Sequence, residues 1–175
     1  MNNSGITHKI FYSQQGEDLL IYRNFINLHT NDGIFLELGA CDGLIYSNTM
    51  FFERYLGFKG VLIEPLKDFY DELIKNRPNN ICYNNAISSN ESDVEILEGG
   101  ACSGIKQHMK KTFIDKWHSK SSIIKVKTKT LSNIFQEKGI KYIDFFSLDV
   151  EGGELDVLKT IIWDNITIYL ICIEL

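Results

Sequence analysis

Residues 35–49 read FLELGACDGLIYSNT: an apolar run, two glycines with an acid between them, and then small polar residues. The run is apolar on both of its alternating faces, which is typical of a strand that is covered on both sides in a parallel sheet. Open α/β sheets bind nucleotides in the turns at the carboxyl ends of such strands. This stretch therefore predicts a first strand followed by a nucleotide-binding turn.

The same apolar pattern recurs along the chain, with helix-like segments between the runs. Strands are predicted at 33–40, 60–65, 142–150 and 166–175, with a further strand at 80–88. Helices are predicted at 49–56, 66–77, 131–138 and 153–163, preceded by a helix at 13–28 with Ser13 as its N-cap. Strands that alternate with helices predict a doubly wound, mostly parallel α/β sheet of the Rossmann-like class.

The length of 175 residues fits one domain. After the helix at 13–28, a cofactor half spans 33–88 and a C-terminal half spans 130–175. Between the two halves, 89–129 reads as an irregular insert whose ends could pair as extra strands. The chain stops at Leu175 inside an apolar run, so we expect the sheet to be cut short there.

Composition excludes several classes of function. The formal net charge of −5 argues against a nucleic-acid binder that works by bulk attraction to phosphate. The four cysteines are widely spaced and form no C-x-x-C pair, so neither a zinc knuckle nor a disulfide framework is expected. With no signal-like start and no apolar run approaching 18 residues, we expect a cytoplasmic chain without membrane insertion.

The turn after the first strand carries acids where a dinucleotide turn would carry glycines. The G-x-G-x-x-G pattern is replaced by Glu37, Gly39, Asp42 and Gly43. Two carboxylates would repel a pyrophosphate and suit a positively charged ligand. S-adenosylmethionine fits this description, because it carries a sulfonium and an ammonium but no phosphate.

Two neighbouring features agree with that ligand. Glu64 ends the second predicted strand, where it could accept hydrogen bonds from two ribose hydroxyls. Residues 47–49 could cap the next helix. The alternative is that the two glycines serve only a tight turn and that Glu64 is a solvent-facing strand end.

Four segments together resemble the FkbM family of S-adenosylmethionine-dependent methyltransferases. They are YSQQGEDLLI (12–21), GIFLELGACDGLIYSNTMFFERYLGFKGVLIEP (33–65), NNAIS (84–88) and FFSLDVEGGELDVLK (145–159). The resemblance covers most of 11–175. It implies the seven-stranded methyltransferase variant of the Rossmann fold, with the last two strands expected beyond Leu175, and methyl transfer, usually to an oxygen of a small molecule or sugar.

The resemblance also implies roles for individual residues. The turn residues Glu37, Gly39, Asp42 and Gly43 would line the methionine part of the cofactor, followed by Asn48 and Thr49. Glu64 would hold the ribose, Pro65 would shape the adenine side, and Asn85 and Ala86 would neighbour the adenine. Gln14 and Glu17 would close over the cofactor, although cap and helix-dipole roles explain them equally well.

Asp149 and Glu151 are the candidate catalytic residues, and Asp149 also counts among the cofactor contacts. They follow the strand FFSLDV and would face the methyl group in this fold, where either could orient the acceptor or take its proton. The alternative is a structural role at the strand end and at the next helix N-terminus. No metal site is predicted, because the two acids have no nearby histidine.

The insert carries His108, His118 and several lysines, for which surface positions are the simpler reading. The expected partner is a small-molecule or sugar hydroxyl acceptor. Two other functions stay open: a nicotinamide-dependent oxidoreductase that uses Glu64 for the ribose, and a non-catalytic module that keeps the fold for a protein partner.

Overall fold

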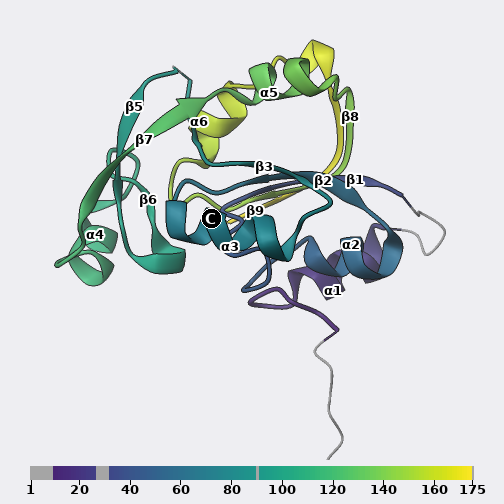
Figure 1. Ribbon diagram of the computed structural model, residues 1–175, viewed down its shortest axis with the longest axis horizontal. Helices are drawn as coiled ribbons and strands as arrows, with labels where there is room; N and C mark the ends of the chain where they lie inside the picture. Colours follow the sequence, from purple (N-terminus) through teal and green to yellow (C-terminus); the bar gives the residue numbers. More distant parts are fainter. Residues whose placement is uncertain (1–9, 27–31, 90, 175) are drawn as a thin grey trace, which may run out of the picture.

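The computed structural model describes residues 10–26, 32–89 and 91–174. Its centre is a five-stranded, fully parallel sheet in the order β3-β2-β1-β8-β9 (Figure 1). The strands are β1 (Ile34–Leu38), β2 (Lys59–Ile63), β3 (Ile81–Tyr83), β8 (Tyr142–Leu148) and β9 (Thr167–Ile173). The strand order reverses between β1 and β8, so these two neighbours mark the switch point at which such sheets bind ligands.

Helices cover both faces of this sheet. In Figure 1, α1 (Glu17–Asn24), α2 (Met50–Leu56) and α3 (Lys67–Asn76) lie below it, and α5 (Leu131–Lys138) and α6 (Glu154–Lys159) lie above it. The doubly wound Rossmann-like prediction is confirmed. Within the described residues, no helix has the length and apolar content needed to cross a membrane.

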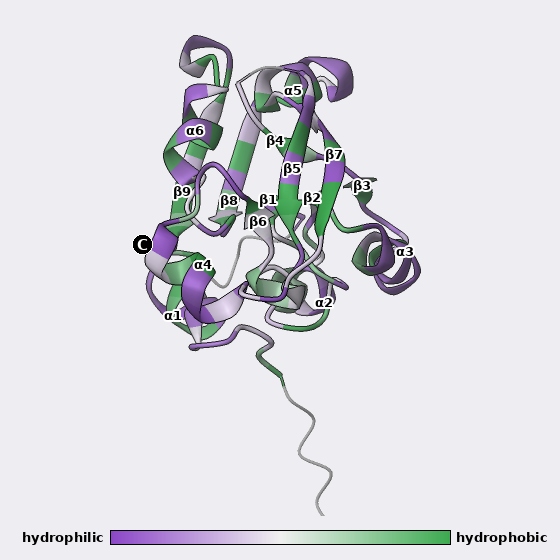
Figure 2. Ribbon diagram, turned by 90° about the vertical axis from the view of Figure 1, so that its left-hand side faces the viewer, coloured by the Kyte–Doolittle hydropathy of each residue, from purple (hydrophilic) through white to green (hydrophobic). Residues whose placement is uncertain are grey.

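The core is divided by the sheet into two apolar layers, which is why β1 is apolar on both faces. Phe35 packs with the aromatic residues of α2, whereas Leu36 packs with α5 and α6. Both side chains are fully buried. In Figure 2 the central strands are largely green, whereas the helices carry both purple and green residues, as expected of helices with one face on the core.

The insert is more regular than predicted, because together with β4 (Ala86–Ile87), which precedes it, it forms a second sheet in the order β4-β7-β5-β6. β5 (Asp93–Leu97) and β7 (Ile123–Lys129) pair antiparallel, as expected for the two ends of the insert. β6 (Gly104–Ile105), the short helix η1 (Gly100–Cys102) and α4 (Lys111–Trp117) lie between them in sequence. Ile96 and Val126 carry the small apolar core of this sheet.

The predicted strand at 80–88 is two strands in different sheets. β3 belongs to the central sheet and β4 (Ala86–Ile87) pairs with β7. Asn84 separates them, because its side-chain amide donates to the carbonyls of Glu64 and Pro65 at 2.9 and 3.0 Å. A polar turn residue inside an apolar run therefore redirects the chain.

Two helix predictions are too long. The helix predicted at 13–28 begins at Glu17, after Gly16 in a left-handed conformation. Ser13 is not its N-cap; its hydroxyl donates to Asp18 at 2.6 Å. Residues 27–28 lie outside the described residues, as does Leu175. The helix predicted at 153–163 ends at Lys159 and is followed by the short helix η2 (Trp163–Asn165).

Thr130→Ala should lower the free energy of unfolding by about 1 kcal/mol. Thr130 is the N-cap of α5, and its hydroxyl accepts the backbone N–H of Asn133 at 3.2 Å. Urea unfolding of both proteins measures the change. Thr130→Ser keeps the acceptor and should stay close to wild type; equal stability of the alanine variant would show that the cap is not needed.

Candidate active site

A cavity of about 310 Å³ lies at the carboxyl ends of the central strands. Its floor comes from the ends of β1, β2 and β8, and its roof from the insert between 96 and 108. This is the switch point of the sheet, and the volume is in the range of small-molecule sites.

Most of the predicted site residues line this cavity. They are Gln14, Glu37, Gly39, Asn48, Glu64, Pro65, Asn85, Ala86, Asp149 and Glu151. The chain thus brings together residues that are up to 137 positions apart in sequence.

Four predicted residues lie outside the cavity lining and shape the turns beside it. Asp42 does not face the cavity, since one of its carboxylate oxygens accepts the backbone N–H groups of Leu44 and Ile45 at 2.9 and 2.7 Å. A hydroxyl–carboxylate bond of 2.6 Å joins Thr49 to Glu37. The other two are Gly43, packed on Arg77, and Glu17, which accepts from the backbone of Gln15.

Gly39 allows the ends of β1 and β8 to come together. Its φ of 75° is left-handed, and a Cβ there would lie 2.2 Å from the backbone oxygen of Asp149. Only glycine fits this close approach. The glycine that the sequence marks as a turn residue therefore brings the predicted catalytic strand end to the cofactor turn.

Glu37 organises the turn that follows β1. It is 3% exposed and accepts hydrogen bonds from the Asn48 N–H at 2.7 Å and from the hydroxyls of Ser47 and Thr49 at 3.0 and 2.6 Å. Burial raises the pKa of Glu37, whereas the charge of Arg77 and these hydrogen bonds act in the opposite direction. Glu37 is thus engaged with its own chain at the edge of the cavity.

Asn48 offers a hydrogen-bond acceptor to the cavity. Its side-chain amide donates to Ser147 at 2.9 Å, while its Oδ1 is buried without a partner. In the described part of the chain, the only other side-chain atom in that condition is Nδ1 of His108, which also lines the cavity. Because buried polar atoms are normally paired, these two are suited to a bound ligand.

Glu64 lies at the end of β2 and is 3% exposed, not solvent-facing. It accepts the backbone N–H groups of Cys41 at 2.9 Å and Leu66 at 2.8 Å. Burial raises its pKa to about 7 in spite of these two bonds. Each carboxylate oxygen keeps a lone pair, so Glu64 can still accept from a ligand.

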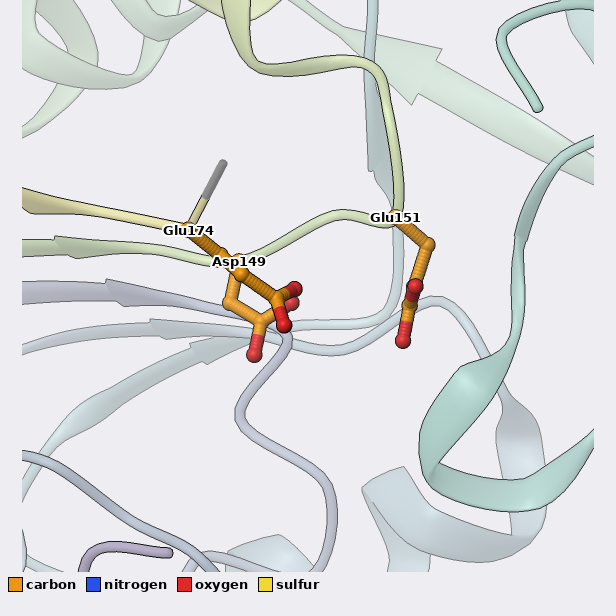
Figure 3. Close-up of side chains that lie close together, drawn as sticks. All are labelled: Asp149, Glu151 and Glu174. Atoms are coloured by element: carbon orange, nitrogen blue, oxygen red, sulfur yellow. The ribbon is translucent and has the colours of Figure 1, made fainter. Parts of the chain in front are cut away.

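Three carboxylates of the cavity lining gather beside the ends of β8 and β9. Figure 3 shows Asp149 and Glu174 at the ends of the adjacent strands β8 and β9, with Glu151 on the turn after Asp149. One oxygen from each lies within 4.8 Å of the others. Burial, followed by the carboxyl of Glu174, raises the pKa of Asp149 to about 8, and burial raises that of Glu151 to about 7. The cluster can hold protons near neutral pH, and its oxygens are also the ligand type of hard divalent cations.

Backbone strain is concentrated beside the cavity. Among the described non-glycine residues, φ is left-handed at Asp32 (60°), which does not line the cavity, and at three residues that do: Cys41 (47°), Tyr46 (58°) and Glu151 (58°). Such conformations cost about 1–3 kcal/mol each and persist where the surrounding structure enforces them, often at functional sites. For Glu151 this strain argues against a purely structural role.

Sequence reasoning missed several residues of the site. Glu174 could have been found as an acid at the end of the strand beside β8. His108 reaches the cavity from the insert, with Nε2 3.0 Å from Asp156, but no local pattern marks it. His118, by contrast, is buried and binds the Cys102 carbonyl and the Ser121 hydroxyl.

The parallel sheet, the glycine turn and the cavity at the switch point are those of a Rossmann-like methyltransferase. The family model for the methyltransferase FkbM domain matches residues 37–175. The chain belongs to this family, and the resemblance found in its motifs is confirmed. No curated protein and no solved structure matches the chain.

Proposed function

We propose that this methyltransferase uses S-adenosylmethionine to methylate a hydroxyl oxygen of a small molecule or carbohydrate. The observation that carries the proposal is the acidic lining of the cavity. Glu37, Glu64, Asp149, Glu151 and Glu174 line it, whereas no lysine or arginine does so among the described residues. Such a lining favours a cofactor that is cationic and free of phosphate.

The cavity residues fit this cofactor in two places. Asn48 Oδ1 lacks a hydrogen-bond donor and would take one from the ammonium. Glu64 has free lone pairs for the ribose hydroxyls, beside Pro65, Asn85 and Ala86 at the adenine end. When bound, the cofactor would supply an electrophilic methyl group on a sulfonium and leave as a neutral thioether.

On the acceptor side, Glu151 is the proposed general base. Its pKa of about 7 allows a large ionised fraction at neutral pH while it remains basic enough to take a proton from a hydroxyl as the oxygen attacks. Asp149, with a pKa of about 8, would keep its proton and could donate a hydrogen bond to the acceptor. Alignment of the acceptor hydroxyl with the methyl group in the cavity would supply the remaining rate acceleration.

The same cavity disfavours the oxidoreductase alternative, because a dinucleotide pyrophosphate would meet carboxylates without a balancing cation. A cytoplasmic location is part of the proposal and is supported by the four cysteines, which are free thiols.

Calorimetric titration with S-adenosylhomocysteine tests the cofactor assignment. We expect saturable binding that weakens as the pH falls through about 7, because Glu64 becomes protonated and can accept fewer hydrogen bonds. NAD serves as the comparison. Binding of NAD with none of S-adenosylhomocysteine would reject the proposal. If S-adenosylhomocysteine binds, a labelled-methyl screen over sugar and small-hydroxyl pools identifies the acceptor.

A further inference from the structure

Arg77 is a fully buried arginine beneath the cofactor turn. It follows α3 directly as the C-cap of that helix, and its side chain is 0% exposed. Burying a guanidinium is costly unless its charge is paired and its N–H groups are bonded. Glu53 accepts from Nε, and a Glu37 oxygen lies 4.0 Å from one terminal nitrogen. The position is therefore built around the charge.

The other side-chain hydrogen bonds of Arg77 go to the turn after β1. One terminal nitrogen donates to the carbonyl of Gly43 at 3.0 Å and to the hydroxyl of Ser47 at 3.3 Å, and the other donates to the hydroxyl of Thr49 at 3.1 Å. The guanidinium carbon lies 5.2 Å from the centre of the Phe35 ring. The guanidinium thus binds three residues of the seven-residue segment 43–49 and packs on the Phe35 ring of β1.

These contacts continue to the cavity through Glu37. The hydroxyls that accept from Arg77 donate in turn to Glu37, which also accepts the N–H of Asn48. Asn48 sits between Ser47 and Thr49 and presents the unpaired Oδ1. Arg77 itself does not line the cavity.

We propose that Arg77 is a positioning residue for the cofactor site, which sets the place of Asn48 by clamping the turn from below. This inference rests on the proposed function, because it takes S-adenosylmethionine as the ligand. It explains why a guanidinium is buried here: a planar fork with several donors reaches all three points of the turn.

Arg77→Lys keeps the charge and loses the fork, so it tests the geometry of the clamp. We expect the dissociation constant of S-adenosylhomocysteine to rise about tenfold, which corresponds to the loss of roughly one good hydrogen bond. Thr49→Val removes one anchor of the turn, leaves Arg77 in place and should weaken binding in the same direction. It provides the test if the lysine variant does not fold.

The control separates positioning from general destabilisation. Phe58 is buried in the same apolar layer, but it precedes β2 at the end of the sheet remote from the cavity. Phe58→Leu should lower the melting temperature and leave the dissociation constant within about twofold of wild type. Calorimetry well below each melting temperature compares the four proteins. If Arg77→Lys and Thr49→Val both bind with wild-type affinity, or if Phe58→Leu loses as much affinity as they do, the positioning role of Arg77 is overturned while the proposed function stands. If wild type does not bind S-adenosylhomocysteine, the proposed function is overturned as well.

Discussion

Glu151→Gln should lower the rate of methyl transfer by about 10²-fold or more, while the affinity for S-adenosylhomocysteine stays within about twofold of wild type. The amide keeps the size of the side chain and the left-handed backbone but cannot take a proton from the acceptor. The effect is expected in the chemical step, because Glu151 is the proposed base, whereas Asn48 and Glu64 are the proposed cofactor contacts. Initial rates with the acceptor from the labelled-methyl screen, combined with calorimetry, measure both quantities.

The pH dependence gives the same prediction a second readout. Burial raises the pKa of Glu151 to about 7, so the base is ionised above this pH and protonated below it. At saturating cofactor, where the titration of Glu64 no longer limits binding, wild-type activity should therefore fall as the pH falls through about 7. This limb should be absent in Glu151→Gln. Glu137→Gln, an exposed carboxylate on α5, is the control and should change neither quantity. A glutamine variant that keeps a third of the wild-type rate would exclude Glu151 as the base.

The central sheet could be predicted from sequence because each of its strands carries its own signal. β1 is apolar on both faces, and a glycine turn follows it directly. The helix at 131–138 also agrees with the structure, since its apolar spacing and its Thr130 cap are local features. Long-range pairing is different. Within the insert, β6 is only two residues long, and β4, which completes the second sheet from outside the insert, is equally short, so both depend on their partner strands.

The turn after β1 shows that residue type alone does not decide which acid faces the cavity. Asp42 and Glu37 were both expected to face the ligand, and both are acids in the same turn. Asp42 instead satisfies two N–H groups of its own turn, whereas Glu37 reaches the cavity edge but is held by a set of hydroxyls. Which donors surround a carboxylate depends on the packing around it, and for Glu37 that packing includes Arg77, distant in sequence.

Only two of the three residues in the acidic cluster were predicted from the sequence, for a similar reason. Asp149 and Glu151 belong to one motif and were recognised together. Glu174 joins them because β9 is the parallel neighbour of β8, so the carboxyl ends of the two strands meet. The sequence of a strand does not indicate which other strand will lie beside it in the sheet.

Asp149→Asn should make the protein more stable than wild type at alkaline pH. The ordinary aspartate pKa of 3.8 is raised to about 8 in the folded protein, first by burial and then by Glu174. The folded state therefore holds this proton more tightly than the unfolded chain does. The stability that the proton provides is complete below about pH 4 and is lost progressively as the pH rises to about 8. Asparagine is neutral at every pH and avoids the loss.

Urea unfolding at pH 5.5, 7 and 9 measures this difference. Wild type should lose stability over the series, and Asp149→Asn should lose less. The slope that remains comes from other groups whose pKa values are raised by burial, among them Glu37, Glu64 and Glu151. Asp164→Asn, an exposed control, should follow wild type. Parallel curves for wild type and Asp149→Asn would contradict the raised pKa. A variant that is more stable yet slower in methyl transfer would show that the carboxyl group is kept for chemistry at the expense of the fold.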